Sequence, residues 1–222
     1  MRKVFLAIPR LGKMADMTEV CRQGIHFEAA GAGIGIQEFQ WSGDSLISHA
    51  RNVCVAKFLE SDCTDLFFLD SDVACGPGAF SRIVKHPVDM VAGVYRVKAE
   101  EVRYPVTWLP KAELWADPGT GLLEVMDVPF GFVRLTRYAV NSLVEAHKDE
   151  WFHSAGAEPI KCWLLFNTEL KDNRFWGEDF FFCRRWRELG GKVWVDPEIP
   201  LQHIDDEGTP YIGHLGNWLR DR

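Results

Sequence analysis

Asp65-Leu66-Phe67-Phe68-Leu69-Asp70-Ser71-Asp72 is the stretch of sequence that decides the fold. Its apolar part is short and bulky, and a segment rich in glycine and proline follows at 76–78, so the stretch predicts a buried strand that ends in a loop. Side chains two positions apart on an extended segment point the same way, so Asp70 and Asp72 are expected at one point beyond the strand. Open α/β sheets bind their ligands at that edge.

Two carboxylates at one point repel each other unless a cation lies between them, and a divalent metal ion is the usual solution. The alternative is a solvated Asp-Ser-Asp turn, for which these residue types are equally well suited. The tripeptide alone does not distinguish the metal site from the turn, so the choice depends on the rest of the chain.

The elements around this strand predict an α/β fold with a Rossmann-like, mostly parallel central sheet flanked by helices. Two further strands joined by the turn at 117–121 predict a small antiparallel insertion. Strands are expected at 4–8 (broken by Pro9), 34–41, 66–72, 90–95, 104–109, 122–128 and 192–195, and helices at 16–30, 44–58, 79–85, 137–147 and 178–189.

Composition limits the possible classes of protein. With 222 residues and 47% hydrophobic content, the chain is expected to form one domain over 1–222. A net charge of −7 argues against nucleic acid or an anionic membrane as the main partner. The apolar run at 4–8 is too short for a signal peptide or a transmembrane segment, and the six cysteines form no C-x-x-C pair. We therefore expect a cytoplasmic protein with reduced thiols; the sequence does not indicate its oligomeric state.

Two dipeptides elsewhere in the chain could belong to the same site. Arg51-Asn52 lies in the helix before the Asp-Ser-Asp strand, where the arginine fork would suit phosphate, although an isolated helix arginine is more often simply exposed. Glu178-Asp179 begins a helix beside Trp176 and three phenylalanines. These two acids complement the helix dipole, and their apolar surroundings would also raise a carboxylate's pKa toward the range of a general base.

A histidine near the end of the chain could complete a metal site. His203 follows the last predicted strand, so in a parallel sheet it would emerge at the same edge as Asp70 and Asp72. Two aspartates and a histidine leave positions open for substrate oxygens, and this mixed set of ligands suits Mn²⁺. His214 is the alternative third ligand, because glycines around it would let it approach.

Together these motifs resemble the GT-A-fold glycosyltransferases, in particular the small bacterial and viral family 2-like and mannan-polymerase-like enzymes. The resemblance covers about residues 4–216 and rests on the joint spacing of the Leu-Asp-Ser-Asp strand end, Arg51-Asn52, the Gly-Glu-Asp-Phe-Phe-Phe-Cys helix and the late histidine. It implies a hexosyltransferase that moves a sugar from a nucleotide-diphosphate sugar, a UDP- or GDP-sugar, to a hydroxyl acceptor such as a glycan. The half at 1–95 would bind the nucleotide, and 96–222 would supply the acceptor side and the metal-binding tail.

The resemblance also implies a role for each matching residue. Asp70, Asp72 and His203 would hold Mn²⁺ or Mg²⁺, and Glu178 or Asp179 would act as the catalytic base. The residues expected to contact the donor are Pro9, Arg10, Arg51, Asn52, Asp70, Ser71 and Gly131. The donor sugar, the base, the acceptor and the choice between inversion and retention are not readable from the sequence.

Three other classes of protein use some of the same residue types. A phosphatase would need a nucleophilic aspartate with further lysine and acidic loops, and the sequence has no convincing set. A metal-dependent nucleotidyltransferase would need a glycine-rich phosphate loop, of which 9–13 is only a faint version. A non-catalytic nucleotide- or sugar-binding module could use the nine tryptophans for stacking, but it would not need Glu178 and Asp179 beside the other acids.

Overall fold

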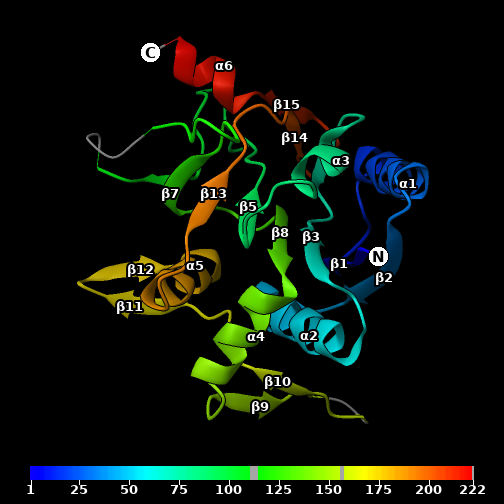
Figure 1. Cartoon of the computed structure of the whole chain (residues 1–222), viewed down its shortest axis with the longest axis vertical. Helices are drawn as coiled ribbons and strands as arrows, with labels where there is room; N and C mark the ends of the chain where they lie inside the picture. Colours follow the sequence, from blue (N-terminus) through cyan, green and yellow to red (C-terminus); the bar gives the residue numbers. More distant parts are fainter. Residues whose placement is uncertain (111–114, 156–157, 222) are drawn as a thin grey trace.

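A computed structural model describes residues 1–110, 115–155 and 158–221, and an eight-stranded sheet lies at its centre (Figure 1). The strand order is β2-β1-β3-β8-β5-β13-β7-β6. The strands are β1 (Lys3–Arg10), β2 (Gly35–Ser42), β3 (Asp65–Leu69), β5 (Met90–Ala92), β6 (Thr107–Trp108), β7 (Leu123–Asp127), β8 (Phe132–Thr136) and β13 (Val193–Val195). Only β8 and β7 run against the common direction of the other strands, so the prediction of a mostly parallel sheet is confirmed.

Helices cover both faces of this sheet (Figure 1). Their bounds are α1 (Asp16–Gly31), α2 (Ile47–Glu60), α3 (Ala79–Ile83), α4 (Arg137–Ala146), α5 (Glu178–Glu188) and α6 (Leu215–Arg220). α1 and α3 pack on one face, whereas α2, α4 and α5 pack on the other. The molecule therefore has three layers, as the strand–helix alternation of the sequence predicts.

Strand β3 sits at the middle of these layers because its residues are buried on both sides. Phe67 and Leu69 join the core beneath α1 and α3, whereas Leu66 and Phe68 join the core beneath α2, α4 and α5. Successive side chains of a strand point to opposite faces, so a run of bulky apolar residues without polar alternation needs cover on both sides. This packing fixes the point at which the chain leaves the sheet and Asp70 begins the loop.

Short antiparallel sheets surround the central one. β4 (Val73–Cys75), β14 (Leu201–Ile204) and β15 (Pro210–Gly213) form a three-stranded sheet. Two hairpins come from the segment that the sequence leaves irregular: β9 (Trp151–His153) with β10 (Lys161–Trp163), and β11 (Glu169–Lys171) with β12 (Arg174–Trp176). The three-stranded sheet matters most for function, because β14 pairs His203 with Val73, the residue that follows Asp72.

The prediction that Pro9 ends the first strand is wrong. β1 continues through Pro9 to Arg10 and pairs with β2 as far as Ser42. On its other side β1 pairs with β3 only as far as Ala7, so Pro9 lies beyond the part of the strand that has two neighbours. A proline lacks the amide hydrogen that a two-sided ladder requires, and it is tolerated where only one neighbour remains.

Candidate active site

The loop after β3 lies at the carboxyl edge of the sheet, and backbone hydrogen bonds tie it to three neighbouring segments. The amide of Asp70 donates to the Gly131 carbonyl (3.0 Å), and the amide of Ala15 donates to the Ser71 carbonyl (2.9 Å). The amide of Ile204 donates to the Asp72 carbonyl (2.8 Å). The loop is therefore fixed between the start of α1, the start of β8 and the end of β14.

Arg51 is the centre of the first part of the site. Its guanidinium, buried in α2, donates from Nη2 to both oxygens of Asp70 (3.1 and 3.0 Å) and from Nη1 to Glu178 Oε1 (2.8 Å) and to Asp179 Oδ1. The ring of Phe130 also lies 5.7 Å from the guanidinium carbon. Residues from α2, the loop after β3 and α5, distant in sequence, thus meet around one cation.

This arrangement differs from the expected contact between Arg51 and the donor. A guanidinium that is 2% exposed and already holds three carboxylates positions those acids rather than meeting a ligand directly. The sequence offers the same residues but does not reveal their pairing, because Arg51 and Glu178 are 127 positions apart. In the structure Arg51 therefore contacts the three acids of the site.

Three acids around one guanidinium leave this buried region with an excess of negative charge. Burial raises the pKa of Asp179 to about 7; Arg51 opposes the shift, and the charges of Glu178 and Asp70 add to it. Burial also raises the pKa of Asp70, again against the influence of Arg51. A carboxylate whose pKa lies near neutral pH can take up and release a proton under working conditions, as a general base must.

Asp72, Lys98 and His203 form the second part of the site. Lys98 Nζ lies 2.6 Å from Asp72 Oδ2, and His203 Nε2 lies 3.3 Å from the same oxygen. Burial alone would raise the pKa of Asp72, but the hydrogen bonds with His203 and Lys98 outweigh it and the pKa falls below its usual value. These two contacts therefore favour the ionised form of Asp72.

The orientation of the His203 ring suits a metal ligand. Nδ1 lies 3.0 Å from the Arg96 carbonyl, which can only accept, so Nδ1 carries a hydrogen and donates it. Nε2 is then the ring nitrogen that faces the Asp72 carboxylate: it donates to Asp72 when it carries a hydrogen, and without that hydrogen its lone pair is available to a cation between the two groups. Histidines that bind metals usually donate their other ring hydrogen in this way.

The residues fit a divalent cation that shares its coordination with a substrate. Within the described parts of the chain, no three His, Cys, Asp or Glu side chains are grouped closely enough to hold a metal alone. The structure brings Asp72 and His203 together, whereas Asp70 lies against Arg51, so two of the three expected ligands meet. Mg²⁺ and related ions commonly use one or two protein ligands and complete their shell with phosphate oxygens and water.

A cavity of about 790 Å³ lies beside Asp72. Ser71 and Asp72 line one part of it, the loop at 11–17 a second and the turn at 204–208 a third. Pro9 and Arg10 end the strand that leads into this loop, and Arg10 donates to the Gly12 carbonyl (3.0 Å). The volume is in the range that ligand pockets of proteins occupy, so the cavity can take a molecule larger than a metal ion.

Asn52 lies next to Arg51 but faces another segment. Its Oδ1 accepts from the amides of Leu165 and Phe166 (3.0 and 2.9 Å), and its Nδ2 donates to the Phe166 carbonyl (2.8 Å). The side chain is buried, so these contacts satisfy most of its hydrogen-bonding capacity. In this structure Asn52 holds the segment after β10 in place through Leu165 and Phe166, and it is not among the residues that line the cavity.

Gly131 brings the backbone close to Asp70. A methyl group built there would lie 2.6 Å from the ring of Tyr95 and 2.9 Å from Asp70 Oδ2, both shorter than side-chain contacts allow. Tyr95, buried beside the His203 ring at 4.5 Å between centroids, is a site neighbour that the sequence analysis missed. Lys98 is the second site neighbour that the sequence analysis missed. Each of the two is a single polar residue in a loop, and such a residue forms no sequence motif.

We expect Gly131→Ala to lower the free energy of unfolding by about 1–3 kcal/mol, the usual cost of overpacking. For a chain of this size that corresponds to a fall of about 2–12 °C in the midpoint of thermal unfolding. Gly24→Ala is the matched control: it is exposed in α1 with no atom near the added methyl, so it should leave the midpoint unchanged or raise it. Equal midpoints for the two variants would contradict the close approach.

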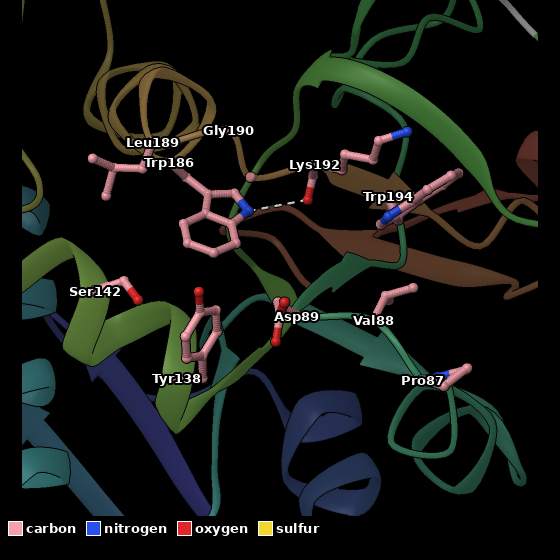
Figure 2. Close-up of a pocket in the computed structure, with 11 residues that line it drawn as sticks. Pro87, Val88, Asp89, Tyr138, Ser142, Trp186, Leu189, Gly190, Lys192 and Trp194 are labelled. Carbon is pink, nitrogen blue, oxygen red and sulfur yellow. Dashed lines mark hydrogen bonds between the residues drawn. The ribbon is translucent and has the colours of Figure 1, made fainter.

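Figure 2 shows a second cavity, of about 380 Å³, whose lining residues differ from those of this site. Tyr138, Trp186 and Trp194 line it together with Asp89, and the Trp186 indole donates to the Lys192 carbonyl (3.0 Å). Asp89 and Lys192 precede β5 and β13, at the amino edge of these parallel strands, whereas Asp70 follows the carboxyl end of β3. The site residues predicted from the sequence therefore belong to the other edge of the sheet.

Comparison with known proteins gives no match by sequence: no protein-family model and no curated protein matches the chain. Its structure is similar to that of GalNAc-T7, crystallised with UDP, GalNAc and Mn²⁺, with a TM-score of 0.56 and 11% identity over 98% of this chain. The chain spans about half of that protein, 48% of its length. A glycosyltransferase involved in glycosylation of the major capsid of PBCV-1 also matches, with a TM-score of 0.38 and 12% identity over 66% of each chain.

The similarity to GalNAc-T7 covers nearly the whole chain, and at 11% identity it is evidence for the fold alone. In this chain the antiparallel β8 lies within a mostly parallel sheet, and the loop with Asp70 and Asp72 follows β3. The chain therefore has the GT-A fold of glycosyltransferases.

Proposed function

We propose that the protein is a metal-dependent glycosyltransferase that moves a sugar from a nucleotide-diphosphate sugar to a hydroxyl acceptor, such as a glycan. The observation that carries this proposal is the meeting of Asp72 and His203 beside a cavity of about 790 Å³, with the Arg51 cluster of acids at the same edge of the sheet. The GT-A fold and the UDP and Mn²⁺ bound to GalNAc-T7 support the same assignment. The donor would lie over the half at 1–95, and 96–222 would supply the acceptor side and the metal-binding tail.

In this proposal Asp72 and His203 hold Mn²⁺ or Mg²⁺, with the remaining positions left to phosphate oxygens and water. When bound, the metal would act as a Lewis acid that stabilises the negative charge developing on the diphosphate leaving group. The cavity residues around Ser71 and the loop after Pro9 and Arg10 would position the nucleotide. Because Gly131 has no side chain, it would leave room for the sugar beside Asp70 and Tyr95.

Asp179 is the base we propose for the acceptor hydroxyl. Burial raises its pKa to about 7, and its Oδ2 is oriented by the amide of Phe130 at 3.2 Å. Glu178, on the same turn of α5, shares the contact with Arg51 and would orient the acceptor or take the proton in its place. The adjacent acids agree with an inverting displacement and are equally compatible with retention.

Release of nucleoside diphosphate from UDP- and GDP-sugars in the presence of Mn²⁺ tests the proposal. Without an added acceptor, water takes the sugar slowly, so the released diphosphate can be measured with the protein alone. We expect Asp72→Ala to abolish this release while the midpoint of thermal unfolding stays close to that of the wild type, because Asp72 is 39% exposed on its side chain. Release that survives in Asp72→Ala would contradict the assignment of the metal site.

Metal-dependent binding without release would instead identify the rival function, a non-catalytic nucleotide- or sugar-binding module. A metal-dependent nucleotidyltransferase would release pyrophosphate from a nucleoside triphosphate. Pyrophosphate release from nucleoside triphosphates, with a sugar phosphate added to accept the nucleotidyl group, distinguishes this activity from glycosyl transfer.

A further inference from the structure

A lysine already neutralises the carboxylate of Asp72, to which the metal would bind. Lys98 Nζ lies 2.6 Å from Asp72 Oδ2, the oxygen that also faces His203 Nε2 at 3.3 Å. No motif of the sequence points to this lysine, and the proposed mechanism does not use it. It comes from the loop between β5 and β6, outside the elements that carry the other acids and His203.

We propose that Lys98 competes with the divalent cation for Asp72 and, once displaced, binds the diphosphate of the incoming donor. This inference rests on the proposed function. Its consequence is that the metal binds weakly to the free protein and tightly only together with a nucleoside diphosphate. Lys98 thereby couples the two binding events.

The competition follows from the geometry of one oxygen. The ammonium, which lies 2.6 Å from Asp72 Oδ2, and a metal ion bound between Asp72 and His203 would share this oxygen, so two positive charges would lie within a few ångströms of each other. Binding of the metal alone must therefore break a charge-assisted hydrogen bond. The Lys98 side chain is 29% exposed, so solvent screens this contact in part and its loss is tolerable.

The loop that carries Lys98 is anchored on both sides of it. The amide of Val97 donates to the Arg103 carbonyl (3.0 Å), and Arg96 Nη2 donates to the Glu100 carbonyl (2.9 Å). The Arg96 carbonyl holds the His203 ring at 3.0 Å. The same short segment thus orients one metal ligand and neutralises the other, and only the flexible lysine stem has to move when the metal enters.

The displaced ammonium would lie beside a site that is about to receive a diphosphate. Asp72 lines the cavity of about 790 Å³, so the ammonium released from Asp72 remains at the cavity that would hold the nucleotide. A diphosphate offers it new anionic oxygens, which restores the lost interaction. Because coupling between two ligands is reciprocal, the nucleotide and the metal each raise the affinity of the protein for the other.

Lys98→Met tests this coupling because it keeps the length of the stem and removes the charge. Mn²⁺ binding without nucleotide is measured from the electron paramagnetic resonance signal of the free ion, and UDP binding at saturating Mn²⁺ by calorimetry. We expect the variant to bind Mn²⁺ alone about three- to tenfold more tightly and UDP about three- to tenfold more weakly. Lys148→Met, which removes a lysine paired with Glu145 on the surface near the end of α4, should change neither affinity.

Changes of opposite sign distinguish competition from a structural role, because a damaged loop would weaken both ligands. Mn²⁺ binding that is lost in Asp72→Ala but unchanged in Lys98→Met would overturn the inference and leave the metal site of the proposed function intact. Absence of Mn²⁺ binding in both the wild type and Lys98→Met would overturn the metal site itself, and the role of Lys98 with it.

Discussion

Replacing Arg51 with methionine is expected to lower the free energy of unfolding by about 3–5 kcal/mol, which is the cost of removing one partner from a buried ion pair. The midpoint of thermal unfolding should fall by about 6–20 °C for a chain of this size. The reason is that Asp70, Glu178 and Asp179 would lose their common counter-charge while remaining partly buried. No other substitution in the site should affect stability as strongly.

The pH dependence of this loss identifies its cause. Burial already raises the pKa of Asp70 and raises that of Asp179 to about 7, and Arg51 opposes both shifts. Without Arg51 both values rise further above those of the unfolded chain, so the folded variant loses stability as the pH rises through its raised pKa values. Chemical denaturation should therefore show a smaller difference between wild type and Arg51→Met at pH 5 than at pH 8.

Arg51→Lys is the matched variant, because it keeps the charge but lacks the planar fork that reaches three carboxylates. We expect it to be destabilised less than Arg51→Met at pH 8. A loss that is equal for both variants and independent of pH would show that packing against Phe130, rather than charge, explains the effect.

The second large effect is expected on catalysis. Asp179→Asn should lower the rate of transfer by about 10²–10⁴, the usual contribution of a general base, and leave donor affinity near that of the wild type. The fold should be retained, because Arg51 keeps Asp70 and Glu178 as partners. Single-turnover transfer and calorimetric titration of UDP with Mn²⁺ separate the two quantities.

The pH profile gives a second measurement for the same residue. Because the pKa of Asp179 is raised to about 7, the wild-type rate should decline as the pH falls below about 7, where the base becomes protonated. The pH profile of Asp179→Asn should lack this decline in rate at acidic pH. Glu178→Gln should lose less activity than Asp179→Asn, and its pH profile should keep the decline. A greater loss of activity in Glu178→Gln than in Asp179→Asn would indicate that Glu178, and not Asp179, is the base.

The sequence predicts the main helices and strands of this molecule because these elements depend on local patterns of residues. The doubly buried β3, the apolar face of α2 and the glycines after α5 each leave a periodic signal, and their predicted bounds differ from the structure by a few residues. Short antiparallel strands such as β4 and β8 were missed because their pairing partners lie far away in the sequence.

The pairings among the predicted site residues could not be read from the sequence. Asp70 and Asp72 are two positions apart and were expected to share one ligand, yet Arg51 binds the first and Lys98 with His203 the second. Which carboxylate receives which cation depends on the packing of α2, α5 and the β5–β6 loop, and no local pattern encodes that packing.

Thermal unfolding with UDP, GDP, CMP and ADP, each with and without Mn²⁺, tests the central claim most directly. A nucleotide at about 100 times its Kd adds roughly 2.7 kcal/mol, which should raise the midpoint by about 5–11 °C. The account predicts such a rise for one nucleoside diphosphate, only with Mn²⁺, and its absence in Asp72→Ala. No rise with any nucleotide, or an equal rise in Asp72→Ala, would contradict it.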